Sequence, residues 1–134
     1  MYLLDTNIWL ERLLEQEKSD EVKLFLDAIP DKEIYISDLS FYSIAIHLDF
    51  KKQHDNLLKF IDDLFIKGRV NLISLEPQLI PEVVKMIKNF KLDFDDAYQF
   101  TCAETFGLEL ISYDKDFDKA KAKRKTPAQI IKMT

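Results

Sequence analysis

The chain begins with a short apolar run that stops abruptly at polar residues. Residues 2–4 are Tyr-Leu-Leu, and residues 5–7 are Asp-Thr-Asn. A continuous apolar run of this kind suits a strand that is buried on both faces, as in a parallel sheet covered by helices. Asp5 would then lie at the carboxyl end of a central strand, which is the edge where open α/β sheets hold their ligands. The first residues therefore constrain both the fold class and the place of a functional site.

Strand-like and helical segments alternate along the rest of the chain. Apolar patterns predict further strands over residues 33–37, 70–75 and 108–112. Helical periodicity covers residues 8–14, 19–29, 41–48, 56–67, 83–87 and 93–106, and a last short helix begins at residues 126–128. This alternation indicates an α/β fold, with a parallel sheet of four to five strands sandwiched between helices. A length of 134 residues predicts a single domain over residues 1–134.

The two glycines support the same alternation. Gly68 and Gly107 each follow a helical pattern and precede a strand. That is the C′ position, where glycine tolerates the left-handed conformation. Asp38 or Ser40 is the predicted N-cap of the helix that follows the strand at residues 33–37. With both glycines at helix ends, none remains for a phosphate-binding loop, so dinucleotide and P-loop motifs are absent.

Composition and charge exclude several classes of site. The single Cys102 excludes an internal disulfide and a cysteine zinc site. A net charge of -5 means that a nucleic-acid partner would need a local basic patch or a bound metal ion. Such a patch is one interpretation of six basic residues near the C-terminus, and a solvated lysine-rich face is the other. They are Lys115, Lys119, Lys121, Lys123, Arg124 and Lys125.

The sequence carries no sign of membrane insertion or export. No apolar run approaches the roughly 20 residues that a membrane helix needs. A strand that begins at residue 2 leaves no place for a signal peptide. We therefore expect a soluble, cytoplasmic protein.

Carboxylates occur at three places that a parallel sheet would bring to one edge. They are Asp5 after the first strand, Asp93, Asp95 and Asp96 at the start of a helix, and Asp114, Asp116 and Asp118 after the last strand. Converging carboxylates repel one another unless a cation lies between them, and oxygen ligands select Mg²⁺ or Mn²⁺. Such ions would hold a phosphodiester and lower the pKa of an attacking water. Singly, each acid also fits a helix cap, a first helical turn or a loop.

Three motifs, in this order and spacing, resemble the PIN domain family, and more narrowly the VapC-type toxins of type II toxin–antitoxin pairs. They are Leu4-Asp5-Thr6-Asn7, Asp96-Ala97 and Ser112-Tyr113-Asp114-Lys115-Asp116-Phe117. The resemblance covers essentially the whole chain. It implies a Rossmann-like α/β/α sandwich and a Mg²⁺- or Mn²⁺-dependent endoribonuclease that hydrolyses RNA phosphodiester bonds. It also implies frequent homodimers and a small antitoxin partner that blocks the site.

The resemblance also implies roles for particular residues. By position, Asp5, Asp96 and Asp114 match the family's catalytic, metal-binding acids, and Asp116 matches an accessory metal-binding acid. Thr6 and Ser112 would orient carboxylates through their hydroxyl groups. Trp9, Phe41 and Tyr42 lie on helices that form dimer or antitoxin surfaces in such toxins, although aromatic residues at helical spacing also suit a core.

The sequence departs from the family pattern at one position. The family has a glutamate on the helix after the second strand, and Ser43 stands there in this chain. Asp38 and His47 are the candidates to compensate. The alternative function is therefore a weakened or inactive PIN-fold module that binds RNA or a protein without cutting. A phosphatase fits less well, because it would need a second aspartate where Asn7 stands.

Overall fold

The computed structural model describes residues 1–120 and 124–133. Within these residues, four strands form one all-parallel sheet in the order β3-β2-β1-β4. The strands are β1 (Tyr2–Leu4), β2 (Ile34–Ser37), β3 (Asn71–Ile73) and β4 (Glu109–Ile111). Tyr2 at the start of β1 is in register with Ile34 of β2 and with Glu109 of β4. The parallel sheet predicted from the sequence is confirmed, and β1 is a central strand between β2 and β4.

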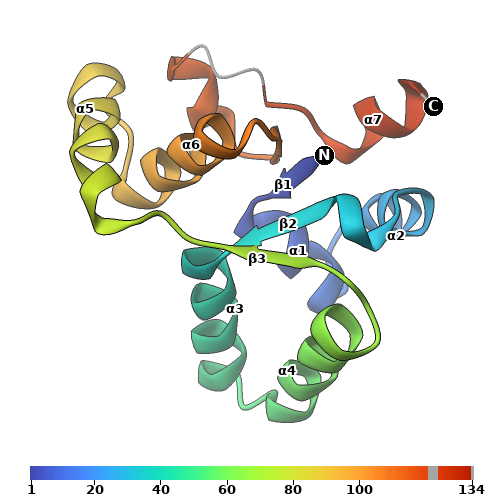
Figure 1. Cartoon of the computed structure of the whole chain (residues 1–134). Coiled ribbons are helices and arrows are strands. Elements are labelled where there is room, and N and C mark those ends of the chain that lie inside the picture. Colours follow the sequence, from blue (N-terminus) through green and yellow to red (C-terminus); the bar gives the residue numbers. More distant parts are fainter. Residues whose placement is uncertain (121–123, 134) are drawn as a thin grey trace.

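Helices cover both faces of this sheet. They are α1 (Thr6–Leu13), α2 (Ser19–Ala28), α3 (Asp38–Phe50), α4 (His54–Ile61), α5 (Ile80–Phe90), α6 (Phe94–Phe106) and α7 (Pro127–Met133). A π-helical turn over Asp62–Ile66 continues α4, so the two together fill most of the predicted helix at residues 56–67. Shorter 3-10 turns are Asp31–Glu33, Pro77–Leu79 and Lys115–Ala120. In Figure 1, α5 and α6 lie together on one side, away from α1 to α4.

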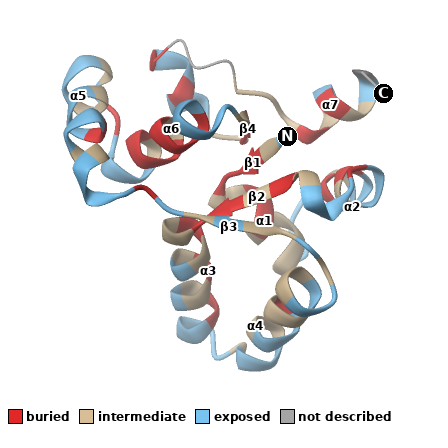
Figure 2. Cartoon of the chain, viewed as in Figure 1, coloured by how far each residue is buried: buried red, intermediate tan, exposed pale blue. Residues whose placement is uncertain are grey.

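The first strand divides two hydrophobic cores. Leu3 and Leu4 are both fully buried. Leu3 packs into the core under α5 and α6, whereas Leu4 packs into the core formed with α1, α2, α3, α4 and α7. Successive side chains of a strand point to opposite faces. An unbroken apolar run is therefore what a strand covered on both faces requires, and the buried strands in Figure 2 lie between the two helical layers.

The structure requires glycine at the two positions for different reasons. Gly107 has φ 64° at the end of α6, which confirms the predicted left-handed position. Gly68 has no positive φ, so the same prediction is wrong there. A Cβ atom on Gly68 would lie 2.4 Å from the backbone oxygen of Asp63 and 2.9 Å from that of Leu64. Close approach of the chain to the preceding π-helical turn, rather than a left-handed backbone, excludes a side chain at Gly68.

The start of α3 differs from the prediction in its capping residue. Ser37, at the end of β2, is the N-cap, and its hydroxyl oxygen accepts a hydrogen bond from the backbone N–H of Ser40 at 3.1 Å. Asp38 and Ser40 already lie inside the helix. Ser40 is left with a buried hydroxyl that faces other elements.

The aromatic residues of the early helices separate into core and surface. Trp9 is buried and donates from its indole N–H to the carbonyl oxygen of Leu4 at 3.2 Å. Phe41 packs against the same core, with its ring close to those of Phe60 and Phe65. Tyr42 is exposed. None of the helices in the described part of the chain is long and apolar enough to cross a membrane.

Candidate active site

The carboxyl edge of the sheet collects the predicted acids. Asp5 follows β1, Asp96 lies in the first turn of α6, and Asp114 and Asp116 follow β4. Asp96, Asp114 and Asp116 each place one carboxylate oxygen within 4.8 Å of those of the other two. These three residues are called the acid triplet below. Residues from the start of a helix and from the end of a strand meet because both lie at the same edge of a parallel sheet.

Asp5 lies beside the acid triplet and is buried, with 6% of its surface exposed. Its Oδ1 atom accepts hydrogen bonds from the Thr6 backbone N–H at 2.8 Å and the Gln99 amide at 3.1 Å. Its Oδ2 atom accepts from the Ser112 hydroxyl at 2.7 Å and the Asn7 amide at 3.1 Å. Asp5 is also the N-cap of α1, which confirms the structural interpretation of this acid, and its catalytic role stays a prediction.

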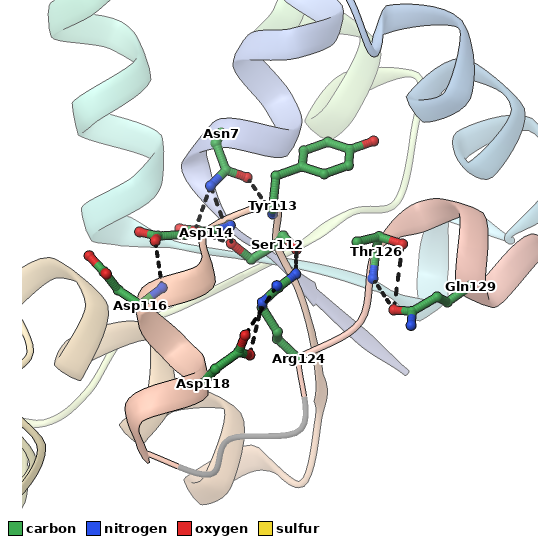
Figure 3. A network of polar contacts seen from close by, with 10 residues as sticks. Asn7, Ser112, Tyr113, Asp114, Asp116, Asp118, Arg124, Thr126 and Gln129 are labelled. Atoms are coloured by element: carbon green, nitrogen blue, oxygen red, sulfur yellow. Dashed lines mark hydrogen bonds and ion pairs between the residues drawn. The ribbon is translucent and has the colours of Figure 1, made fainter.

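Ser112 and Asn7 join Asp5 to the segment that carries two acids of the triplet. Figure 3 shows Asn7 and Ser112 beside Asp114 of this segment. The Ser112 Oγ atom accepts hydrogen bonds from the backbone N–H of Asp114 at 2.9 Å and from the Asn7 amide at 3.2 Å. Asp114 Oδ1 in turn accepts from the backbone N–H of Asp116 at 2.9 Å. The hydroxyl of Ser112 therefore contacts a carboxylate, as predicted from the resemblance.

The hydroxyl of Thr6 does not have the predicted partner. It donates to the Ser40 hydroxyl oxygen at 2.8 Å, and the backbone N–H of Thr6 is the group that reaches Asp5. The difference arises because Thr6 is the first residue of α1, where the backbone N–H has no partner within the helix. The amide of Asn7 supplies the side-chain donor on this side of Asp5.

The concentration of negative charge changes the proton affinity of the acids. Burial, and after it the negative charges of Asp114, Asp5 and Asp116, together raise the pKa of Asp96 to about 7. Burial also raises the pKa of Asp5, while the hydrogen bonds from Ser112, Gln99 and Thr6 act in the opposite direction. A group of carboxylate oxygens with unbalanced charge matches the donor set that Mg²⁺ and Mn²⁺ prefer. The residues present therefore fit such a cation.

The remaining predicted acids lie outside the acid triplet. Asp93 is the N-cap residue of α6, and Asp95 is exposed. Asp118 forms an ion pair with Arg124, in which Oδ1 lies 3.2 Å from Nε, and Figure 3 shows this pair directed away from Asp114. Sequence spacing thus identified the segments that carry the acids, but it did not select among the acids within each segment. In the structure, only Asp96 from the start of α6 and Asp114 and Asp116 from the segment after β4 form the triplet.

Neither candidate to replace the missing glutamate belongs to the acid triplet. Asp38 Oδ1 accepts hydrogen bonds from the Tyr98 hydroxyl at 2.7 Å and from the backbone N–H of Leu39 at 2.8 Å. His47 lies in the last turn of α3 and is half-buried. Ser43 is half-buried on the same helix.

The basic residues after β4 are largely paired with acids. Lys119 lies 3.4 Å from Asp116, and Lys125 lies 2.5 Å from Glu109. Arg124 binds Asp118 as described above. Lys121 and Lys123 lie outside the described residues. The Lys119–Asp116 pair is exposed on both sides, whereas the side chains of Arg124 and Lys125 are only 14% and 29% exposed. An exposed ion pair is weak, so a phosphate group would compete with Asp116 for Lys119, and a phosphate-contacting patch stays a prediction.

Comparison with known proteins identifies the family. The profile of the PIN domain matches residues 2–123. The chain belongs to the PIN domain family. A comparison with curated proteins gave no significant match. Among solved structures, this PIN domain is similar to a toxin–antitoxin complex from Klebsiella pneumoniae, with 25% identity and a TM-score of 0.75 over 95% of this chain and 98% of the other.

Two further solved structures share the fold of this PIN domain. FitAcB from Neisseria gonorrhoeae is 23% identical, with a TM-score of 0.76 over 96% of this chain and 99% of the other. VapC20 from Mycobacterium tuberculosis, described as a sarcin–ricin loop cleaving toxin, is 15% identical, with a TM-score of 0.80 over 95% and 100%. In both comparisons the similarity covers nearly the full length of the other chain.

Sequence reasoning missed two polar residues that contact the site. Gln99 is buried one helical turn after Asp96, and Ser40 is buried near the start of α3. The sequence does contain a signal for Gln99. It is a long polar residue among the mostly small or apolar residues that α6 buries in the core. Ser40 gives no comparable signal, since serine in the first turn of a helix is ordinary.

We predict that the metal-free chain loses stability as the pH rises, because of Asp96. The folded-state pKa is about 7 against an ordinary value of 3.8, so the folded chain binds more protons between these values. The free energy of unfolding should fall over this range. Because Asp96 is only half-buried, solvent screening reduces the effect, and Asp96→Asn should stabilise the chain at about pH 8 by on the order of 1 kcal/mol.

Urea denaturation in EDTA at about pH 5 and about pH 8, on either side of the folded-state pKa of Asp96, measures this effect. The matched control is Asp95→Asn, an exposed neighbour outside the acid triplet, which should keep the wild-type pH dependence. The attribution to Asp96 would be wrong if Asp96→Asn lost as much stability between the two pH values as the wild type.

Proposed function

We propose that this PIN domain is a metal-dependent endoribonuclease that hydrolyses RNA phosphodiester bonds in the cytoplasm, as a toxin of the VapC type. The observation that carries the proposal is the acid triplet, in which three carboxylates lie within 4.8 Å of one another at the ligand edge of the sheet. Burial and the neighbouring carboxylates raise the pKa of Asp96, and a divalent cation would offset the repulsion among these charges. The family match and the similarity to toxin structures support the assignment.

The site contains two groups of residues. The first would bind the cation, and the second positions the acids through hydrogen bonds. Asp96, Asp114 and Asp116 would bind Mg²⁺ or Mn²⁺, with Asp5 beside them. When bound, the ion would polarise the scissile phosphate and lower the pKa of the attacking water. Ser112 and Asn7 fix the distance between Asp5 and Asp114 through their hydrogen bonds. This fixed geometry would orient the phosphate and the water for hydrolysis.

We expect RNA cleavage that is abolished by EDTA and by single replacement of Asp5, Asp96 or Asp114 with asparagine. The rate should fall at least roughly 100-fold, since loss of a group that only supports a metal ligand already costs about 10- to 100-fold. A gel assay with labelled RNA and Mn²⁺ measures the rate. Asp95→Asn should cleave like the wild type. Cleavage that survives EDTA would rule out the metal-dependent mechanism.

A second candidate function rests on Ser43. A serine hydroxyl is a weaker ligand than the carboxylate that the family has at this position, and Asp38 is held by Tyr98. On this alternative, the chain keeps the PIN fold and binds RNA or a protein without cutting. The half-buried position of Ser43 on α3 leaves partial access for a longer side chain.

Ser43→Glu separates the two functions in the same cleavage assay. If the wild type is a degenerate enzyme, we expect the variant to gain roughly 10-fold or more in Mn²⁺-dependent cleavage, as for a regained supporting group. Ser43→Gln, which adds the same length without the charge, should show no gain. Robust cleavage by the wild type with no gain in Ser43→Glu would remove the binding-module alternative.

We further propose an antitoxin partner and a homodimer. The Klebsiella neighbour is a toxin–antitoxin complex by its description, and another neighbour is FitAB bound to a DNA fragment. A groove of about 570 Å³ between α1, α2 and α4 offers an inhibitor a surface with apolar and charged lining. A cognate antitoxin would stop cleavage in the assay above.

For the dimer, α3 carries three exposed apolar residues one turn apart, Tyr42, Ile46 and Phe50.

Replacement of Ile46, the middle residue of this row, tests the dimer. Ile46 is 69% exposed, so Ile46→Lys should not disturb the core. We expect light scattering to give twice the chain mass for the wild type and one chain mass for the variant, because a buried charge opposes association. Leu24→Lys, at a similarly exposed position on α2, should remain dimeric. A dimer that persists in Ile46→Lys would place the interface elsewhere.

A further inference from the structure

A buried amide connects Asp5 to two helices. Gln99 is 2% exposed and lies on α6, one turn after Asp96. Its Nε2 group donates to Asp5 Oδ1 at 3.1 Å and also makes a short hydrogen bond to the hydroxyl oxygen of Ser40 on α3. The amide of Gln99 therefore connects α6 both to the Asp5 carboxylate and to α3.

The orientation of this amide carries a cost. Within the described residues, the buried Oε1 atom of Gln99 has no hydrogen-bond partner. A reversed amide would give Oε1 the Ser40 hydroxyl as a donor, but it would set Oε1 against an oxygen of Asp5. The observed orientation thus satisfies Asp5 and leaves an acceptor unpaired, which is unfavourable in a protein interior. An apolar side chain of the same length would avoid that cost, so packing does not explain a glutamine here.

The contacts of Gln99 form a closed circuit through three helices. Ser40 also accepts a hydrogen bond from the Thr6 hydroxyl at 2.8 Å, and the Thr6 backbone N–H donates to Asp5 Oδ1 at 2.8 Å. The circuit Asp5–Gln99–Ser40–Thr6 thus fixes Oδ1 from α6, α3 and α1. A network in which each polar group restrains the next is stiffer than its separate contacts.

Gln99 and Ser112 occupy corresponding places on the two sides of Asp5. Ser112 donates to Oδ2 and also accepts from the backbone N–H of Asp114, so it sets Asp5 relative to the segment that carries Asp114. Gln99 donates to Oδ1 and lies three residues after Asp96 on the same helix, so it sets Asp5 relative to α6. One oxygen of Asp5 is thereby tied to each of the two segments of the acid triplet.

We propose that Gln99 is a positioning residue, which holds Asp5 at a fixed distance from Asp96 and so prepares the site for a divalent cation. The effect of this positioning on cation binding rests on the proposed metal-dependent function. The positioning of Asp5 itself does not require a cation. This chain lacks the family glutamate on α3. Its α3 helix instead joins the buried network through Ser40, which accepts a hydrogen bond from Gln99.

Gln99→Met tests the proposal, because methionine keeps the length of the side chain and removes the amide donor. The matched control is Thr101→Val on the same helix, which removes the buried hydrogen bond from Thr101 to the carbonyl oxygen of Ala97 at 2.8 Å and does not touch Asp5. Calorimetric titration of the purified, metal-free chain with Mn²⁺ measures affinity. We expect roughly 10- to 100-fold weaker binding in Gln99→Met and less than about 2-fold change in Thr101→Val.

A second measurement needs no metal. The ¹H–¹⁵N resonance of the Thr6 backbone N–H, which donates to Asp5, should move in Gln99→Met and stay in place in Thr101→Val. If Gln99→Met does not fold, Ser40→Ala replaces it, since this variant removes the anchor of the amide and keeps Gln99. The Mn²⁺ titration then decides, with a smaller loss of affinity expected, because Ser40→Ala also removes the partner of the Thr6 hydroxyl and would move the Thr6 resonance directly.

The outcomes separate this proposal from the proposed function. Wild-type Mn²⁺ affinity together with an unmoved Thr6 resonance in Gln99→Met would overturn the positioning role, and so would an equal loss of affinity in Thr101→Val. A folded wild type that binds no Mn²⁺ would overturn the metal-dependent function. In that case, a Thr6 resonance that moves only in Gln99→Met would still support the positioning of Asp5.

Discussion

The burial of one carboxylate, that of Asp5, is the constraint on which the rest of the site depends. A buried charge is unfavourable unless hydrogen bonds replace the water that it loses. Here four donors do so, from the Thr6 backbone and from the side chains of Asn7, Gln99 and Ser112. These donors come from three separate parts of the chain. Satisfying one carboxylate therefore requires α1, α6 and the end of β4 to meet in a single arrangement.

Much of this arrangement follows from the sequence by simple physical rules. The apolar run before Asp5 indicated a strand covered on both faces, and parallel strands place their carboxyl ends at one edge. The positions of Asp96 and Asp114 beside Asp5 then follow from helix starts and strand ends. What the local pattern does not contain is the order of the strands and the crossing of α3 with α6. The contact between Gln99 and Ser40 depends on both, and the residues are 59 positions apart.

Two other differences have the same origin. Gly68 and Gly107 stand at equivalent places in the sequence pattern, but only Gly107 is left-handed, because a π-helical turn brings the chain close to Gly68. The lysines and arginine after β4 form a basic cluster in the sequence, yet Lys125 lies against Glu109 of β4.

The central position of β1 has a consequence for the order in which the molecule is made. The first strand pairs with β2 on one side and with β4, more than 100 residues later, on the other. Contacts between such distant segments form late and slow the folding of a domain. Two of the acids beside Asp5 follow β4. A ribosome must therefore synthesise the chain through Asp116 before the acids can meet, and any product that is terminated earlier has an incomplete site.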